Sequence, residues 1–237
     1  MSKLDQIIVA LDNMTENEAL SFVEENHHTL KFYKVGMELF YKSGRDFLKK
    51  LSENYQVRIF LDLKLYDIPN TVSKAISTFE GLNIEFLTIH TSGGREMLEK
   101  AQIAASKAIP NCKLLGVTVL TSFSPASFKE TLGTDFEDGI SNLYKTSLSA
   151  NIPGIVCSTQ DIQKLKAQNH GNHPLFVCPG IRFEDEIQSG QISDQKRVAS
   201  PKEAFKIGAD YLVIGRSLTS VESNLRTKRI EEISLIK

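Results

Sequence analysis

The chain has 237 residues, which is long for one average domain but ordinary for a single large α/β domain with a sizeable core. Its 28 basic and 29 acidic residues nearly cancel, which argues against binding to nucleic acid or a membrane through bulk charge and means that any anion site must be local. We therefore expect one domain over residues 1–237.

Eight short apolar runs, each about as long as a β-strand, recur along the chain. They are IIVALD (7–12), FYKVGM (32–37), VRIFLDLKL (57–65), FLTIH (86–90), KLLGVTVL (113–120), GIVCS (154–158), LFVCPG (175–180) and YLVIGR (211–216). Between them, segments such as TENEALSFVEENHH and GREMLEKAQIAASKA carry apolar residues at three- and four-residue intervals, as amphipathic helices do. Segments 121–138 and 182–201 break this rhythm, and we expect them to be long loops that carry function.

The alternation of strand and helix predicts the fold class. Parallel strands need crossover connections, so eight such units in a chain of this length favour a closed (β/α)₈ barrel, the TIM barrel, with an open doubly wound sheet as the alternative. In such a barrel the active site lies at the carboxyl ends of the strands. Polar residues gather at or just beyond those ends: Asp12, Lys34, Asp62, Lys64, His90, Thr121, Ser158, Arg182 and Arg216.

The strand at 57–65 places charges inside an apolar run. Side chains alternate across a strand, so Asp62 and Lys64 share one face while the leucines between and around them share the other. We expect the leucines to pack against the outer helices and the two charges to point toward the barrel mouth, where Lys34 can reach them. Asp67 follows just after the strand and extends the alternation of charge.

Two interpretations of these charges are open. The first is a structural network of ion pairs around the barrel rim, which perturbs pKa values without catalysis. The second is a site for a small anionic substrate, in which a carboxylate stands beside a developing charge and a lysine gives a proton. Because two of the charges share the inward face of one strand, the second interpretation explains more of the pattern.

The residues of this charged strand and of the segment after it resemble a known family. The pattern Asp62-x-Lys64-x-x-Asp67-Ile-x-x-x-Thr71 resembles the signature of the orotidine 5′-phosphate decarboxylase family, which makes UMP in pyrimidine biosynthesis. The resemblance continues through VALD, YKVGMELF, IHTSGG, VTVLTS, PGIR, DQKRV and VIGRS, so it spans all eight units in order. It implies a carboxy-lyase that converts orotidine 5′-phosphate to UMP and carbon dioxide.

The resemblance also implies roles. Lys64 would donate a proton to C6 of the pyrimidine, Asp62 would lie close to the substrate carboxylate, and Lys34 and Asp67 would complete the charge array. Asp67 and Thr71 would act across the interface of a homodimer. The resemblance implies further substrate-binding residues: Asp12 with Lys34 for the ribose, Thr121 near the pyrimidine, Gln195, Gly215 and Arg216 for the phosphate end, and Pro179 and Arg182. Arg182 either contacts the loop or the phosphate or pairs with Glu184 or Asp185, and both roles stay open here.

The family chemistry explains the charges. Loss of carbon dioxide leaves an electron pair on a vinylic carbon, and the sequence has no cofactor motif that would supply an electron sink. A preorganised ammonium can stabilise that carbanion and then protonate it. We therefore expect neither a cofactor nor a metal. Asp62 either repels the departing carboxylate or chiefly holds Lys64 in position, and both roles stay open here.

Three rival functions compete. Sugar-phosphate decarboxylases and synthases of the same superfamily use a divalent metal, but they carry an acid where this chain has Lys34, and lysine is a poor magnesium ligand. In a barrel aldolase, Lys64 would instead form a Schiff base. A catalytically silent barrel that only binds phospholigands is the third.

The cellular setting follows from the apolar runs and the thiols. The start, MSKLDQIIVALD, fits a first strand better than a signal peptide, and no stretch approaches the roughly 18 apolar residues of a membrane span. Cys112, Cys157 and Cys178 lie far apart, without the spacing of metal ligands. We therefore expect a cytoplasmic protein with no nucleic acid or membrane partner.

Overall fold

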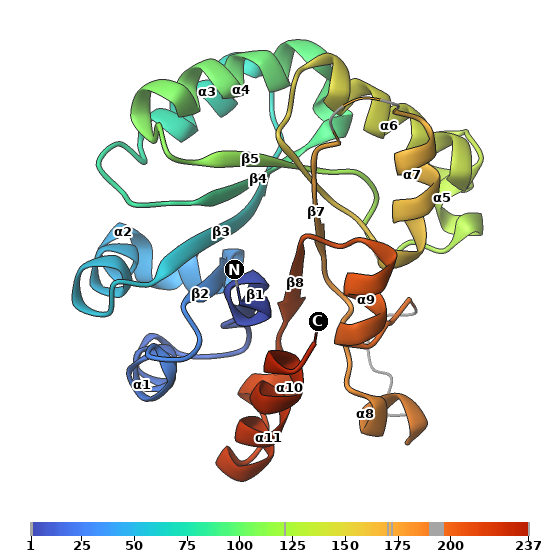
Figure 1. Cartoon of the computed structure of the whole chain (residues 1–237). Coiled ribbons are helices and arrows are strands. Elements are labelled where there is room, and N and C mark those ends of the chain that lie inside the picture. Colours follow the sequence, from blue (N-terminus) through green and yellow to red (C-terminus); the bar gives the residue numbers. More distant parts are fainter. Residues whose placement is uncertain (1, 121, 170, 172, 190–196, 237) are drawn as a thin grey trace.

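A computed structural model describes residues 2–120, 122–169, 171, 173–189 and 197–236 of the chain. Its centre is a closed barrel of eight parallel strands in chain order (Figure 1). The strands are β1 (Ile7–Ala10), β2 (Phe32–Gly36), β3 (Arg58–Leu65), β4 (Phe86–His90), β5 (Lys113–Val117), β6 (Gly154–Val156), β7 (Leu175–Cys178) and β8 (Tyr211–Ile214).

The barrel closes through the pairing of β1 with β8, in which Ile8 lies opposite Val213. This pairing decides between the two predicted architectures, because an open doubly wound sheet would leave both edge strands unpaired. The (β/α)₈ barrel is therefore confirmed. Each predicted apolar run contains one strand, and most strands end one to three residues earlier than the run.

Helices surround the barrel (Figure 1). They are α1 (Glu16–Asn26), α2 (Met37–Asn54), α3 (Pro69–Ser77), α4 (Gly94–Ala108), α5 (Pro125–Leu132), α6 (Phe136–Ser149), α7 (Ile162–Ala167), α8 (Glu184–Gln188), α9 (Pro201–Ile207), α10 (Arg216–Thr219) and α11 (Ser223–Ser234), with 3₁₀ turns η1 (Lys3–Gln6), η2 (Thr91–Gly93) and η3 (Thr159–Asp161). Among the helices in the described ranges, none is long and apolar enough to cross a membrane.

The prediction of a long loop at 121–138 was wrong, because helix α5 and the first residues of α6 lie within it. Ser124 caps α5 by accepting a hydrogen bond from the Ser127 N–H, Pro125 follows at the first helical position, and Gly133 ends the helix with φ 70°. These boundary signals define a short helix where the regular alternation of strand and helix is interrupted. The predicted loop at 182–201 likewise contains the short helix α8.

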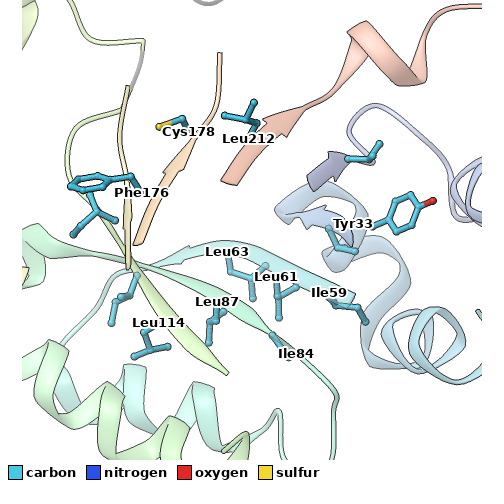
Figure 2. Packing of buried hydrophobic residues seen from close by; sticks show 14 of the residues in the cluster. Tyr33, Ile59, Leu61, Leu63, Ile84, Leu87, Leu114, Phe176, Cys178 and Leu212 are labelled. Carbon is cyan, nitrogen blue, oxygen red and sulfur yellow. The ribbon is translucent and has the colours of Figure 1, made fainter. Parts of the chain in front are cut away.

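The core has two layers that follow the alternation of the strands. One cluster inside the barrel contains Phe32, Phe60 and Phe86, while a second cluster between the strands and the helices contains Leu61 and Leu63. Figure 2 shows Leu61 and Leu63 of β3 beside Leu87 of the neighbouring strand β4. Two residues beyond each inward phenylalanine comes a polar residue on the same inward side of its strand, and this step of two positions the candidate site.

Candidate active site

Four charged side chains from three neighbouring strand ends form a connected array at the barrel mouth. The Nζ atom of Lys34 on β2 lies 2.7 Å from Oδ1 of Asp12, which follows β1, and 3.5 Å from Oδ2 of Asp62 on β3. The same Asp62 oxygen lies 2.9 Å from Nζ of Lys64. The structure thus brings Lys34 to the Asp62–Lys64 pair, as the sequence predicts, and joins Asp12 to the same array.

Asp62 is the buried centre of this array. Burial by itself raises the pKa of the Asp62 carboxyl, but the ammonium groups of Lys34 and Lys64 and hydrogen bonds from Lys64 and Thr88 outweigh burial and lower that pKa. Its side chain is 12% exposed, against 28% for that of Lys64. A carboxylate held charged beside a partly accessible ammonium is an arrangement that can deliver a proton to a bound ligand.

The backbone of β3 departs from regular pairing at these residues. Leu61 lies opposite Leu87 of β4, yet the next pair joins Leu65 to Ile89, so the register shifts between them. Lys64 has φ 48°, a left-handed conformation that costs a lysine about 1–3 kcal/mol. Simple alternation, as predicted from the sequence, therefore ends at Lys64, although its side chain still reaches Asp62.

A cavity of about 390 Å³ joins this array to the phosphate end predicted from the sequence. Its lining includes the four charged residues of the array and, from the later strands, Pro179, Arg182, Gly215 and Arg216. Arg216 begins the one-turn helix α10 directly after Gly215. The Nη1 atom of Arg182 donates a hydrogen bond to the carbonyl of Ile181. One cavity lined both by this mixed-charge array and by two arginines suits an anionic ligand.

Asp67 and Thr71 lie elsewhere on the same chain. Both are exposed, and among the described residues neither lines the cavity. The Asp67 carboxylate accepts a hydrogen bond from the N–H of its neighbour Ile68 and makes no ion pair with another described residue of its chain. Thr71 lies in the first turn of α3. Within one chain the array is therefore Asp12–Lys34–Asp62–Lys64, and Asp67 is not part of it.

The remaining predicted residues fall into two groups. Thr121 and Gln195 lie outside the described residues. His90 ends β4 at the mouth, half-buried, with its ring centroid 5.7 Å from that of Tyr66. Ser158 has a structural place, since its hydroxyl accepts a hydrogen bond from the N–H of Gln160 at the start of η3.

Sequence reasoning missed two residues that shape the array. Thr88 is fully buried on β4, and its hydroxyl donates to Asp62 Oδ1 at 2.9 Å. Its place two residues after the inward Phe86 was the available signal. At Gly36, a Cβ atom would stand 3.0 Å from Asp12 Oδ1 and 3.3 Å from Lys34 Nζ. A glycine there leaves room for the Asp12–Lys34 pair.

Comparison with known proteins identifies the family. The Orotidine 5′-phosphate decarboxylase / HUMPS family matches residues 5–228. The chain belongs to this family. The orotidine 5′-phosphate decarboxylase of Ehrlichia canis is 42% identical over 223 residues, which cover 93% of this chain and 93% of that protein. The one from Malacoplasma penetrans is 38% identical over 231 residues, which cover 95% of this chain and 97% of that protein.

Solved structures agree with the family assignment. The crystal structure of orotidine 5′-phosphate decarboxylase from Lactobacillus acidophilus matches this one with a TM-score of 0.80 and 33% sequence identity, and the match covers 96% of each chain. The resemblance inferred from the ordered motifs is therefore confirmed at the level of the family.

Proposed function

We propose that this protein decarboxylates orotidine 5′-phosphate to UMP and carbon dioxide, a step of pyrimidine biosynthesis, without a cofactor. The observation that carries the proposal is that one cavity is lined both by the Asp12–Lys34–Asp62–Lys64 array and by Arg182 and Arg216. The names of the relatives support it, since they are orotidine 5′-phosphate decarboxylases that match nearly the whole chain.

Lys64 is the proposed proton donor. When the bond between C6 and the carboxylate carbon breaks, carbon dioxide leaves and its bonding electron pair stays on C6. The Lys64 ammonium, held 2.9 Å from Asp62, stabilises that carbanion and transfers a proton to it, which gives UMP and a neutral amine. The amine then regains a proton from solvent.

The other cavity residues bind the rest of the substrate. Asp12 and Lys34, paired at 2.7 Å, present an acceptor and a donor that suit the ribose hydroxyls. Arg182 and Arg216 suit the phosphate dianion, because guanidinium groups form charge-assisted hydrogen bonds with phosphate oxygens. Pro179 and Gly215 also line the cavity and would contact the nucleotide. Thr121 beside the pyrimidine and Gln195 at the phosphate complete the proposed set.

The active enzyme is proposed to be a homodimer in which Asp67 and Thr71 enter the partner's site. Asp67 is exposed and does not line the cavity of its own chain, and it stands between Tyr66 and Ile68, whose exposed fractions are 62% and 66%. Exposed apolar side chains of this size, beside a charged residue, are typical of an interface that is covered in the assembly.

The metal-assisted branch of the superfamily is the second candidate, because the family description covers more than the decarboxylases. Lys34 argues against it. A divalent ion needs oxygen ligands, and an ammonium 3.5 Å from Asp62 would occupy and repel the position beside that carboxylate. Within the described residues, no group of three or more acidic, histidine or cysteine side chains is arranged to hold a metal ion.

We also propose that the chain acts as one domain in the cytoplasm. The family match extends from residue 5 to residue 228. Cys112, Cys157 and Cys178 are free thiols, which is the state that a reducing compartment maintains.

The test is direct. Purified protein treated with a chelator should consume orotidine 5′-phosphate, followed by the loss of its ultraviolet absorbance, and should release one UMP per substrate. Activity that appears only after a divalent metal is restored would favour the metal-assisted branch. A protein that binds UMP but leaves orotidine 5′-phosphate unchanged would refute the proposed function.

A further inference from the structure

The irregular pairing of β3 with β4 assigns an unusual position to Thr88. Between the pairs Leu61–Leu87 and Leu65–Ile89, the β3 strand advances four residues while β4 advances two. Three residues of β3, the two charged ones and Leu63, are therefore opposite a single residue of β4. That residue is Thr88, which is 0% exposed.

The Thr88 hydroxyl connects both functional residues of the bulged strand. Its oxygen accepts a hydrogen bond of 2.8 Å from the backbone N–H of Lys64 and donates one of 2.9 Å to Oδ1 of Asp62. The first bond replaces the pairing that a backbone carbonyl of β4 would supply in a regular ladder. The second bond occupies Oδ1 of Asp62, so the other carboxylate oxygen, Oδ2, pairs with Lys34 and Lys64.

We propose that Thr88 is a positioning residue that sets the relative placement of the Lys64 ammonium and the Asp62 carboxylate. This inference rests on the proposed function, because it concerns the same site. Thr88 does not line the cavity, so it acts without touching the substrate. One hydroxyl fixes both the left-handed backbone of Lys64, with φ 48°, and the orientation of its carboxylate partner.

Loss of this hydroxyl should affect the chemical step more than binding. The ribose and phosphate contacts come from other strands, whereas the proton donor is held by the bulge. A displacement of about 1 Å in a reacting group can cost about 10²-fold in rate. We therefore expect Thr88→Val, which keeps the side-chain shape, to lower kcat by about 10²-fold while KM and the affinity for UMP stay unchanged.

Three variants separate positioning from a general packing effect. Thr88→Ser keeps the hydroxyl and should restore most of kcat. Thr88→Ala also removes the hydroxyl and adds no volume. The loss of the hydroxyl can therefore still be tested if Thr88→Val does not fold. Thr91→Val is the matched control, because Thr91 is also fully buried and its hydroxyl donates to the carbonyl of Val117 at 2.9 Å, away from the array.

The measurements are kcat and KM for orotidine 5′-phosphate, UMP binding by calorimetry, and thermal unfolding of each variant. Loss of kcat in Thr88→Val and Thr88→Ala, recovery in Thr88→Ser and normal kcat in Thr91→Val support the inference. Normal kcat without the Thr88 hydroxyl, or equal losses in Thr88→Val and Thr91→Val, would overturn it. If the unmodified protein itself shows no decarboxylation, the proposed function fails instead.

Discussion

The Nζ atom of Lys64 lies 2.9 Å from Oδ2 of Asp62, and Nζ of Lys34 lies 3.5 Å from the same oxygen. One buried carboxylate is therefore shared by two ammonium groups. Because two cations this close repel each other in a site of low dielectric, the carboxylate between them decides where each cation stands.

The first prediction concerns Asp62→Asn. Loss of the negative charge leaves Lys34 and Lys64 to repel each other, so Lys64 should move from its working position and kcat should fall by about 10²-fold. If Asp62 chiefly positions Lys64, the KM of Asp62→Asn should not be lower than that of the unmodified protein, even though its kcat is. A steady-state comparison checks this, because a simultaneous drop in KM would indicate relief of ground-state repulsion instead.

The second prediction concerns the phosphate end. Arg216→Ala should reduce kcat/KM by at least about tenfold, since a hydrogen bond to a charged group contributes about 1.5–3 kcal/mol. With the truncated nucleoside orotidine, added phosphite should accelerate the unmodified protein but have little effect on Arg216→Ala. Arg95→Ala is the matched control, because Arg95 pairs with Glu99 on the exposed surface of α4. Equal phosphite acceleration in Arg216→Ala would refute the assigned role.

The third prediction tests the shared site of the dimer. Asp67→Asn and Lys64→Ala should each be nearly inactive alone. After the two variants are mixed under conditions that exchange subunits, each mixed dimer should contain one intact site. A 1:1 mixture should then recover about a quarter of normal activity. If both residues act within one chain, the mixture will stay inactive, which an activity assay after exchange reveals.

The fourth prediction concerns pH and His90. Burial lowers the pKa of the His90 imidazole below its ordinary 6.5, nearby Lys64 lowers it further, and Asp62 acts in the opposite direction. As pH falls below 6.5, His90 becomes protonated in the unfolded chain before it does in the folded protein. The stability that neutral His90 contributes is therefore fully present above pH 6.5. This stability is lost as the pH falls from 6.5 to the lower pKa of His90 in the folded protein.

The measurement is the free energy of unfolding from denaturant titrations at roughly pH 7.5 and pH 5. The unmodified protein should lose more stability between these two conditions than His90→Gln, which does not titrate. Parallel losses in the two proteins would show that His90 does not contribute to the pH dependence.

The barrel was predictable because its signals are local and repeated. Each strand is a short apolar run and each helix has its own periodicity, so eight alternating units lead to the closed architecture. The array was predictable for a related reason, since Lys34 and Asp62 lie near the carboxyl ends of neighbouring strands on the inward side. The order of motifs along the chain then gave the family.

Other features depend on contacts between segments that no single run reveals. The bulge of β3 requires knowledge of how Leu65 pairs with Ile89, and the importance of Thr88 becomes visible only with that register. Helix α5 is short and breaks the regular alternation of strand and helix, so only its boundary signals at Ser124 and Gly133 distinguish it from a loop. Asp67 illustrates a further limit, because its proposed partners belong to another subunit.

The central claim is that Lys64 performs the proton transfer in decarboxylation. The most direct measurement compares turnover of orotidine 5′-phosphate and binding of UMP in chelator-treated Lys64→Ala and in the unmodified protein. We expect turnover to fall below detection while UMP binding largely persists, because Asp12, Lys34 and Arg216 still line the cavity. Near-normal turnover by Lys64→Ala would contradict the account.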